Sequence, residues 1–323
     1  MDSACHCSFV VRRSEMKNMI SFGCFQNQKR VRQIKNNVAG YLFITPFIIG
    51  IFVFTLYPFV SSLYFSFTDY NGFSEPEWIG LKNYIEMFTK DKKFWTSLWV
   101  TIKFTVVQVP TKLAFSLLVA VLLSKKTKLT NIYRTIFYVP SLIGGGVAVA
   151  LTWRQIWNMD GVINTILQKF GIAPVNWLNS TSLALYVLVL LGVWQFGSQM
   201  IIFLAAINDV PSELHEAAKL DGASSITRFF KITLPMITPA LFFNLVQAII
   251  NSLQAFNSAY LITSGGPLNS TLYYGLYQYR QAFEYMNMGY ASAMAWFLMI
   301  MVVALTALTF RSSSGWVYYK DEL

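Results

Sequence analysis

Charged residues are scarce in this chain of 323 residues. Asp, Glu, Lys and Arg together make up 12% of it, whereas hydrophobic residues make up 55% and aromatic residues 16%. So few charges cannot cover the surface of a water-soluble protein of this length. The composition therefore excludes an ordinary soluble domain and indicates that much of the chain lies in a lipid bilayer.

Groups for enzyme chemistry are also missing. Both histidines, His6 and His215, lie outside the apolar runs, and those runs hold no acid, base or metal-binding cluster. No glycine-rich phosphate-binding loop followed by Lys-Ser or Lys-Thr occurs, so we expect no catalytic site, metal or cofactor in this chain. All three cysteines, Cys5, Cys7 and Cys24, precede the first apolar run. They are expected to be reduced thiols rather than a disulfide framework.

The apolar residues that are present form six runs, each long enough to cross the ~30 Å hydrocarbon core of a bilayer as a helix. The runs are Val38 to Phe67, Leu98 to Ser124, Thr135 to Trp157, Ser182 to Ile207, Met236 to Ile262, and Gly289 to Phe310. Backbone polar groups in lipid must pair with each other, so helices are expected despite many β-branched residues. The sequence predicts an all-α integral membrane protein with six transmembrane helices.

The basic residues are distributed unevenly over the connections between these runs. The formal net charge is +10, and most Lys and Arg residues fall in the two tails, 1–37 and 311–323, and in the connections on their side of the membrane. By the positive-inside rule both tails are expected in the cytoplasm. We therefore expect the charge to meet lipid headgroups and not nucleic acid. Residues 26–37 are either an amphipathic helix or a disordered basic tail.

The connection 208–235 is long for a link between two membrane helices. Residues 209–213 carry signals that open a helix, Gly222 ends it, and Ser224 and Ser225 can cap a second helix that Pro235 ends. The pattern predicts two helices meeting at a sharp glycine turn. Such an elbow could be seated in a groove of a partner protein, or it could be a solvated amphipathic loop.

A resemblance favours the first alternative. Glu216-Ala217-Ala218, then Gly222, then Ile232-x-Leu234-Pro235 stand at the spacing of the signature loop of binding-protein-dependent ABC importer permeases. The resemblance to the carbohydrate-uptake branch, which includes the larger maltose permease subunit, covers nearly the whole chain from about residue 38. Further segments that carry it are 41–46, 65–70, 134–140 and 289–293. The large outer domain of the maltose relative is lacking, so its substrate contacts cannot be transferred.

The resemblance implies a type I ABC importer permease fold for residues 38–310, in a bacterial cytoplasmic membrane. It also implies a second permease subunit, two ATPase subunits that bind ATP and Mg, an extracytoplasmic solute-binding protein and an oligosaccharide substrate. The connection 208–235 would be the coupling helix that contacts an ATPase. The residues expected there are Glu213, Glu216, Ala217, Ala218, Asp221, Gly222 and Ala223.

Polar side chains within the fifth run suggest a route for the substrate. Asn244, Gln247, Asn251, Gln254 and Asn257 are spaced to lie on one stripe of a helix. They either line a wet pathway or fasten helices together by hydrogen bonds. Other candidates for the pathway, each also explicable by packing, are Phe256, Tyr260, Trp194, Gln195, Gln199, Lys112 and Arg154.

The charges of Lys103, Lys112 and Arg154 would favour an acidic, alginate-like oligosaccharide if they line the route. A neutral sugar stays open. The alternative to an ATP-driven importer is a self-sufficient secondary carrier or channel for a small polar solute. It would transport without ATPase subunits.

Overall fold

The computed structural model describes residues 40–125 and 129–318. Expectations for the tail 1–37, its cysteines and the last five residues lie outside this part. The chain divides into two compact units, Met1–Ser62 and Leu63–Leu323. The first apolar run forms the helix Gly40–Ser66, which includes a π-helical segment, η1 (Phe52–Leu56), followed by α2 (Tyr57–Ser66).

Two further helices are long and apolar enough to cross a membrane unbroken. They are α4 (Lys92–Leu123) and α15 (Met288–Ser313). Three bent pairs pass the same criteria: α5 (Thr130–Ile143) with α6 (Val147–Ile156), α8 (Ala184–Trp194) with α9 (Gly197–Asn208), and the segment Ser225–Met236 with α13 (Thr238–Leu253). With each pair taken as one span, the described residues give the six spans that the sequence predicts.

The bends were not foreseen in full. The α5–α6 pair bends by 102°, the α8–α9 pair by 46° and the pair before α13 by 67°. Pro140 lies inside α5, and Gly144–Gly146 separates α5 from α6. Proline and glycine loosen a helix because proline lacks a backbone donor and glycine has the greatest backbone freedom.

The fifth run is not one helix to Ile262, and this expectation is wrong. Helix α13 ends at Leu253, and a π-helical segment, η3 (Ala259–Thr263), follows after an irregular stretch around Ala255 and Phe256. No proline or glycine marks this break in the sequence. Irregular backbone at membrane depth is tolerated where it lines a wet cavity, which the sequence alone does not reveal.

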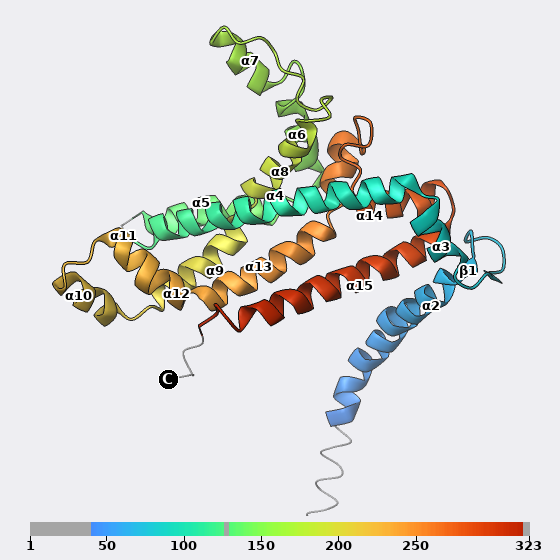
Figure 1. The fold of residues 1–323 in the computed structure, drawn as a ribbon, viewed down its shortest axis with the longest axis horizontal. Coiled ribbons are helices and arrows are strands. Elements are labelled where there is room, and N and C mark those ends of the chain that lie inside the picture. Colours follow the sequence, from blue (N-terminus) through green and yellow to red (C-terminus); the bar gives the residue numbers. More distant parts are fainter. Residues whose placement is uncertain (1–39, 126–128, 319–323) are drawn as a thin grey trace, which may run out of the picture. The chain divides into compact units, whose positions relative to one another are not determined.

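Helix α4 is the central element of the second unit. It packs against α8, α9, α13 and α14 (Tyr274–Tyr279), as Figure 1 shows for α9 and α13. One apolar cluster, which includes Phe94, Phe104, Tyr273 and Tyr274, packs around the first half of α4. A second cluster, which includes Met200 and Phe203, packs around its other half. These two clusters hold the bundle together on either side of the helix breaks.

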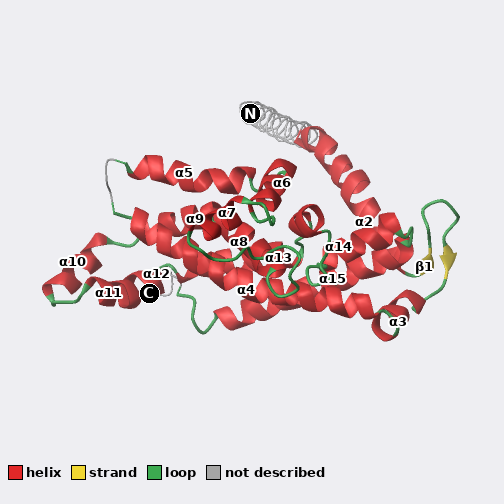
Figure 2. Cartoon of the chain, turned by 90° about the horizontal axis from the view of Figure 1, so that it is seen from above, coloured by secondary structure: helices red, strands yellow, loops and turns green. Residues whose placement is uncertain are grey.

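Short elements cap the end of the second unit that carries α14, here called the α14 end (Figure 2). Strands β1 (Thr68–Asp69) and β2 (Glu77–Trp78) pair antiparallel, and α3 (Lys82–Thr89) follows them. Trp78 ends β2, and α3 begins at Lys82. A π-helical segment, η4 (Arg280–Glu284), continues α14. Helix α7 (Val162–Lys169) follows α6 and lies apart from this end (Figure 1).

Asp91 joins several of these elements. Its Oδ1 caps α4 by accepting from the backbone N–H groups of Lys93 and Phe94, at 2.9 and 3.1 Å. Its Oδ2 accepts from the hydroxyls of Tyr277 in α14 and Tyr290 in α15, at 2.7 and 2.6 Å. Burial, followed by the Asp91 carboxylate, raises the pKa of the Tyr277 hydroxyl, so the proton that it donates to Asp91 is held more firmly than in a free tyrosine. The aspartate ties α4, α14 and α15 together.

Replacing Asp91 by alanine is expected to loosen the α14 end. The change removes a helix cap, which contributes about 0.5–2 kcal/mol, and two hydrogen bonds to a charged group, each about 1.5–3 kcal/mol. We expect a lower melting temperature of the purified complex. Asp69→Ala is the control, because Asp69 is exposed. Equal melting temperatures for the two variants would show that the Asp91 contacts do not stabilise this end.

Candidate functional sites

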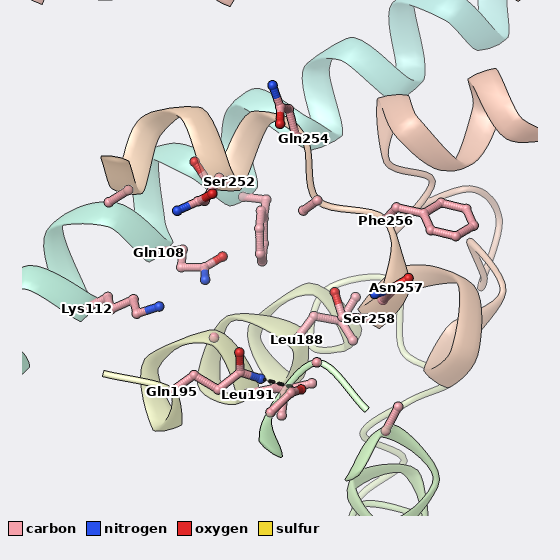
Figure 3. Close-up of a pocket in the computed structure, with 18 of the residues that line it drawn as sticks. Gln108, Lys112, Leu188, Leu191, Gln195, Ser252, Gln254, Phe256, Asn257 and Ser258 are labelled. Carbon is pink, nitrogen blue, oxygen red and sulfur yellow. Dashed lines mark hydrogen bonds between the residues drawn. The ribbon is translucent and has the colours of Figure 1, made fainter. Parts of the chain in front are cut away.

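A cavity of about 310 Å³ lies where the broken spans meet. Its walls come from α4, the Gly144–Gly146 break, the end of α8, the start of α9, the second half of α13 and residues 254–258 (Figure 3). The break at the end of α13 is therefore part of the wall. Membrane transporters commonly build solute sites from discontinuous helices, because the break presents polar groups to the solute.

The lining of this cavity is rich in amides. Six amide side chains and two serines contribute to it: Gln108, Gln195, Gln199, Asn251, Gln254, Asn257, Ser252 and Ser258. Lys112 is the charged residue among the lining residues, and it forms no ion pair in the described part of the chain. Figure 3 shows Lys112 and Gln108 projecting from α4 into the space bounded by Gln195 and Ser258. Amide groups both donate and accept, so the wall suits a neutral, polyhydroxylated ligand as well as an anionic one.

Two glycines let glutamine side chains approach the backbone closely. The Gln195 Nε2 donates to the Gly144 carbonyl at 2.8 Å, and a Cβ built on Gly144 would collide with the Gln195 side chain. A Cβ built on Gly192 would likewise collide with the Gln108 amide. Close packing explains why a glycine stands at position 144 of the Gly144-Gly145-Gly146 run. The shape of the cavity wall depends on the lack of side chains at Gly144 and Gly192.

The variant Gly144→Ala is expected to displace Gln195 and break its bond across the two helix breaks. We expect transport to fall about two- to tenfold, because one buried hydrogen bond contributes about 0.5–1.5 kcal/mol. Gly145→Ala is the matched control, since no described atom lies within 4 Å of a Cβ built there. Initial uptake rates of the two variants check this prediction. Equal loss in both would indicate a general effect on the break.

Seven of the residues that the sequence places on the pathway line this cavity: Asn251, Gln254, Asn257, Phe256, Gln195, Gln199 and Lys112. Asn244 and Gln247 lie outside its lining. Asn244 is buried and its Nδ2 donates to the Gln199 backbone carbonyl at 3.3 Å, which fastens α13 to α9. Gln247 is exposed. A single stripe of five amides is not formed, because the helix ends before Gln254.

The other three candidates also lie outside the lining. Trp194 packs against Trp153 with ring centroids 5.9 Å apart, and Arg154 is exposed in the last turn of α6. Tyr260 stacks on Phe256, with centroids 5.2 Å apart and an interplanar angle of 16°. Phe256 is among the lining residues, and Figure 3 shows its ring turned away from Lys112 and Gln108.

Three polar lining residues were missed from the sequence: Gln108, Ser252 and Ser258. A signal existed for Gln108, which lies one helical turn before Lys112 and therefore on the same face of α4. The two serines reach the cavity only because of how the chain folds at the break, so no signal in the sequence points to them. Ser252 is in the last turn of α13 and Ser258 precedes η3.

A larger cavity, of about 390 Å³, lies at the α14 end beside Asp91. Several of its polar lining groups are already bonded to one another. Asn287 donates to Gln281, Gln281 donates to the hydroxyl of Tyr277, and Tyr277 donates to Asp91. This cavity is better explained by the hydrogen-bond network that fastens the α14 end than by a solute site.

The connection 208–235 forms the expected elbow. Helix α10 (Ser212–Leu220) is followed by Gly222 at φ +78°, a left-handed conformation that favours glycine. Ser224 Oγ then accepts from the Thr227 N–H at 3.2 Å and caps α11 (Ser225–Arg228). The helix continues through η2 (Phe229–Thr233) and α12 (Leu234–Met236), so it ends one residue after Pro235 rather than at it.

The elbow presents its side chains outward. No residue of α10 is buried, and Glu213, Glu216, Ala217, Asp221 and Gly222 are exposed, while Ala218 and Ala223 are half-buried. Large apolar side chains are exposed beside them, with Leu220 at 89% and Ile226 at 72%. Contiguous exposed apolar groups rimmed by charges are typical of a protein-binding surface.

Comparison with known proteins identifies the family. Residues 112–314 match the model of the family described as binding-protein-dependent transport system inner membrane component. The chain is 51% identical over 298 residues to a probable ABC transporter permease protein, YesP, of Bacillus subtilis, covering 91% of this chain and 96% of the relative. It is 34% identical to the lactose transport system permease protein LacF of Rhizobium radiobacter, covering 86% and 94%.

A solved structure shares the fold. The match, in a bacterial alginate ABC transporter in complex with a periplasmic protein carrying an alginate pentasaccharide, has a TM-score of 0.75 at 22% identity. It covers 87% of this chain and 96% of that chain. The resemblance read from the signature loop is thus confirmed. The chain belongs to the family of binding-protein-dependent transport system inner membrane components, the permease subunits of ABC transporters.

Proposed function

We propose that this chain is the permease subunit of an importer that passes an oligosaccharide through the amide-lined cavity. The observation that carries the proposal is the convergence of three broken spans on one cavity with six amides in its wall. Relatives in the family are named as permeases for lactose and for arabinooligosaccharides. The amides can pair with sugar hydroxyls.

The energy for import comes from partner subunits. We propose that two ATPase subunits bind ATP and Mg, and that one of them receives the exposed elbow of α10 and α11. A second permease subunit completes the pathway, and a solute-binding protein delivers the sugar. Closure of the ATPase pair would move the elbow as a rigid body and switch the cavity between the two sides of a bacterial cytoplasmic membrane. In this arrangement the elbow and both chain termini face the cytoplasm.

The cavity also favours an acidic sugar. Lys112 is the formal charge in the lining, and no described carboxylate pairs with it. A charge held within a membrane span is costly unless water or a partner compensates it. A uronate carboxylate, as in an alginate-like oligosaccharide, would supply that partner. This proposal rests on Lys112, because the alginate transporter resembles this chain in fold at 22% identity.

Stimulation of ATP hydrolysis tests both parts of the proposal, the import of an oligosaccharide and the preference for an acidic one. The chain would be reconstituted in proteoliposomes with its partner permease, ATPases and binding protein, and given neutral or uronic oligosaccharides. We expect stimulation by oligosaccharides, and stronger stimulation by uronates. Stimulation by neutral sugars alone would contradict the acidic substrate. Solute uptake by this chain reconstituted alone would instead support a self-sufficient carrier or channel.

Cross-linking tests the role of the elbow. With Cys5, Cys7 and Cys24 replaced by serine, Ala217→Cys would carry the only thiol of the chain, at an exposed position of α10. We expect it to be trapped on an ATPase subunit in the assembled importer. Ser74→Cys, exposed between β1 and β2, is the control and should capture no ATPase. Failure of Ala217→Cys to capture an ATPase would contradict the coupling role.

A further inference from the structure

We propose that Gln108 and Gln199 select the sugar by accepting hydrogen bonds from its free hydroxyl groups. The inference rests on the proposed function of the cavity and assigns the two residues that read the ligand there. Both line the same cavity, Gln108 from α4 and Gln199 from the first turn of α9. Neither residue belongs to the break at the end of α13. Gln108 and Gln199 therefore come from other helices than the amides within residues 251–257.

The first argument is that the two side-chain oxygens lack partners. Gln108 Oε1 and Gln199 Oε1 are both buried, and neither accepts a hydrogen bond from any described residue. Gln199 is 8% exposed, so its amide is held within the protein and not in bulk water. Buried amide oxygens in folded proteins are nearly always paired, and an unpaired one is unfavourable. A donor from water or from a ligand in the cavity would satisfy them.

The second argument is that two neighbouring amide donors are already engaged elsewhere. Gln195 uses its Nε2 to bond the Gly144 carbonyl. The Asn244 Nδ2 donates to the Gln199 backbone carbonyl and not to the Gln199 side-chain oxygen. The side-chain oxygens of Gln108 and Gln199 are therefore left as acceptors, and the ligand that matches them is a donor of hydroxyl protons.

This chemistry defines the substrate class more closely. A sugar with unblocked hydroxyls pairs with both oxygens, whereas an O-methylated sugar leaves them unpaired and adds bulk. A site built to bond a hydroxyl rejects the analogue that lacks it far more strongly than an apolar pocket rejects an extra methylene, because its own polar groups stay unsatisfied. We therefore expect this permease to discriminate against O-methylated sugars by itself, in addition to any selection by the binding protein.

The test compares two probes across matched variants of the whole importer. The probes are a trisaccharide of the class that stimulates ATP hydrolysis, uronate or neutral, and the same trisaccharide with its hydroxyls O-methylated. The variants are Gln108→Met and Gln199→Met, which keep the side-chain length and remove the acceptor. Gln247→Met, an exposed amide outside the cavity, is the control. The binding protein is the same throughout, so its selection cancels when preference ratios are compared.

We expect each of the two cavity variants to lower the preference for the free trisaccharide about three- to tenfold, the size of one hydrogen bond, with the control at the wild-type ratio. Saturation-transfer NMR on the permease and ATPase complex without binding protein gives the same comparison if the methylated probe is not delivered. Wild-type preference in both cavity variants would overturn the inference alone. Absence of ATP-dependent uptake of either probe by the wild-type importer would instead overturn the proposed function.

Discussion

Replacing Gly222 by valine is expected to abolish most ATP-driven import while the chain stays folded in the membrane. Gly222 sits between α10 and α11 at φ +78°. Valine strongly disfavours this conformation, at a cost of about 1–3 kcal/mol, which corresponds to a roughly 5- to 150-fold change in a conformational equilibrium. No described atom lies within 4 Å of a Cβ there, so the backbone and not a clash causes the effect. The angle of the elbow would change.

The measurement is sugar uptake together with sugar-stimulated ATP hydrolysis in proteoliposomes. We expect both to fall for Gly222→Val, with unchanged amounts of assembled complex. Gly171→Val is the matched control, because Gly171 has nearly the same conformation, φ +76°, and equally open surroundings, but lies outside the elbow after α7. Similar impairment of both variants would point to a general folding defect. Normal uptake by Gly222→Val would refute the coupling role.

Replacing Lys112 by methionine is expected to remove the preference for acidic sugars. A hydrogen bond between charged groups contributes about 1.5–3 kcal/mol, so kcat/KM for a uronate oligosaccharide should fall by roughly 10- to 150-fold. Import of a neutral oligosaccharide should change little. The variant is expected to insert normally, because removing a central charge lowers the insertion cost by about 2.5–3.5 kcal/mol. Lost uptake could not then be ascribed to failed insertion.

Two controls accompany this variant. Lys112→Arg keeps the positive charge and should retain much of the acidic preference. Lys103→Met removes an exposed charge from the same helix but outside the cavity lining, and should leave the preference unchanged. Kinetics with uronic and neutral probes of equal length give the comparison. Parallel losses for both sugars in Lys112→Met would show that the lysine supports packing and not the recognition of a carboxylate.

The elbow could be read from the sequence because its signals are local. Gly222 adopts a left-handed backbone conformation. Ser224 caps the following helix by accepting a hydrogen bond from the N–H of Thr227, three residues later. Each feature depends on a few neighbouring residues, so a linear pattern is enough to specify it. The same holds for the six apolar runs, whose lengths are set by the thickness of the bilayer.

The cavity could be read only in part. Asn251, Gln254, Asn257 and Gln199 were identified as polar groups in apolar runs, and they line it. Asn244 carries the same signal yet bonds a backbone carbonyl of α9. An amide in a membrane helix must either pair with another helix or meet water, and periodicity does not distinguish the two outcomes.

The sequence by itself determined that this protein lies in a lipid bilayer, how many spans it has and where the elbow forms, because composition and short-range patterns control these features. The tertiary structure decided where the spans break and which polar groups the breaks bring together. The stretch around Ala255 and Phe256 is not helical, although it contains no proline or glycine. The Gln108 side chain fits where it lies because Gly192 has no side chain. Such features depend on contacts between distant segments, which exist only when the bundle is assembled.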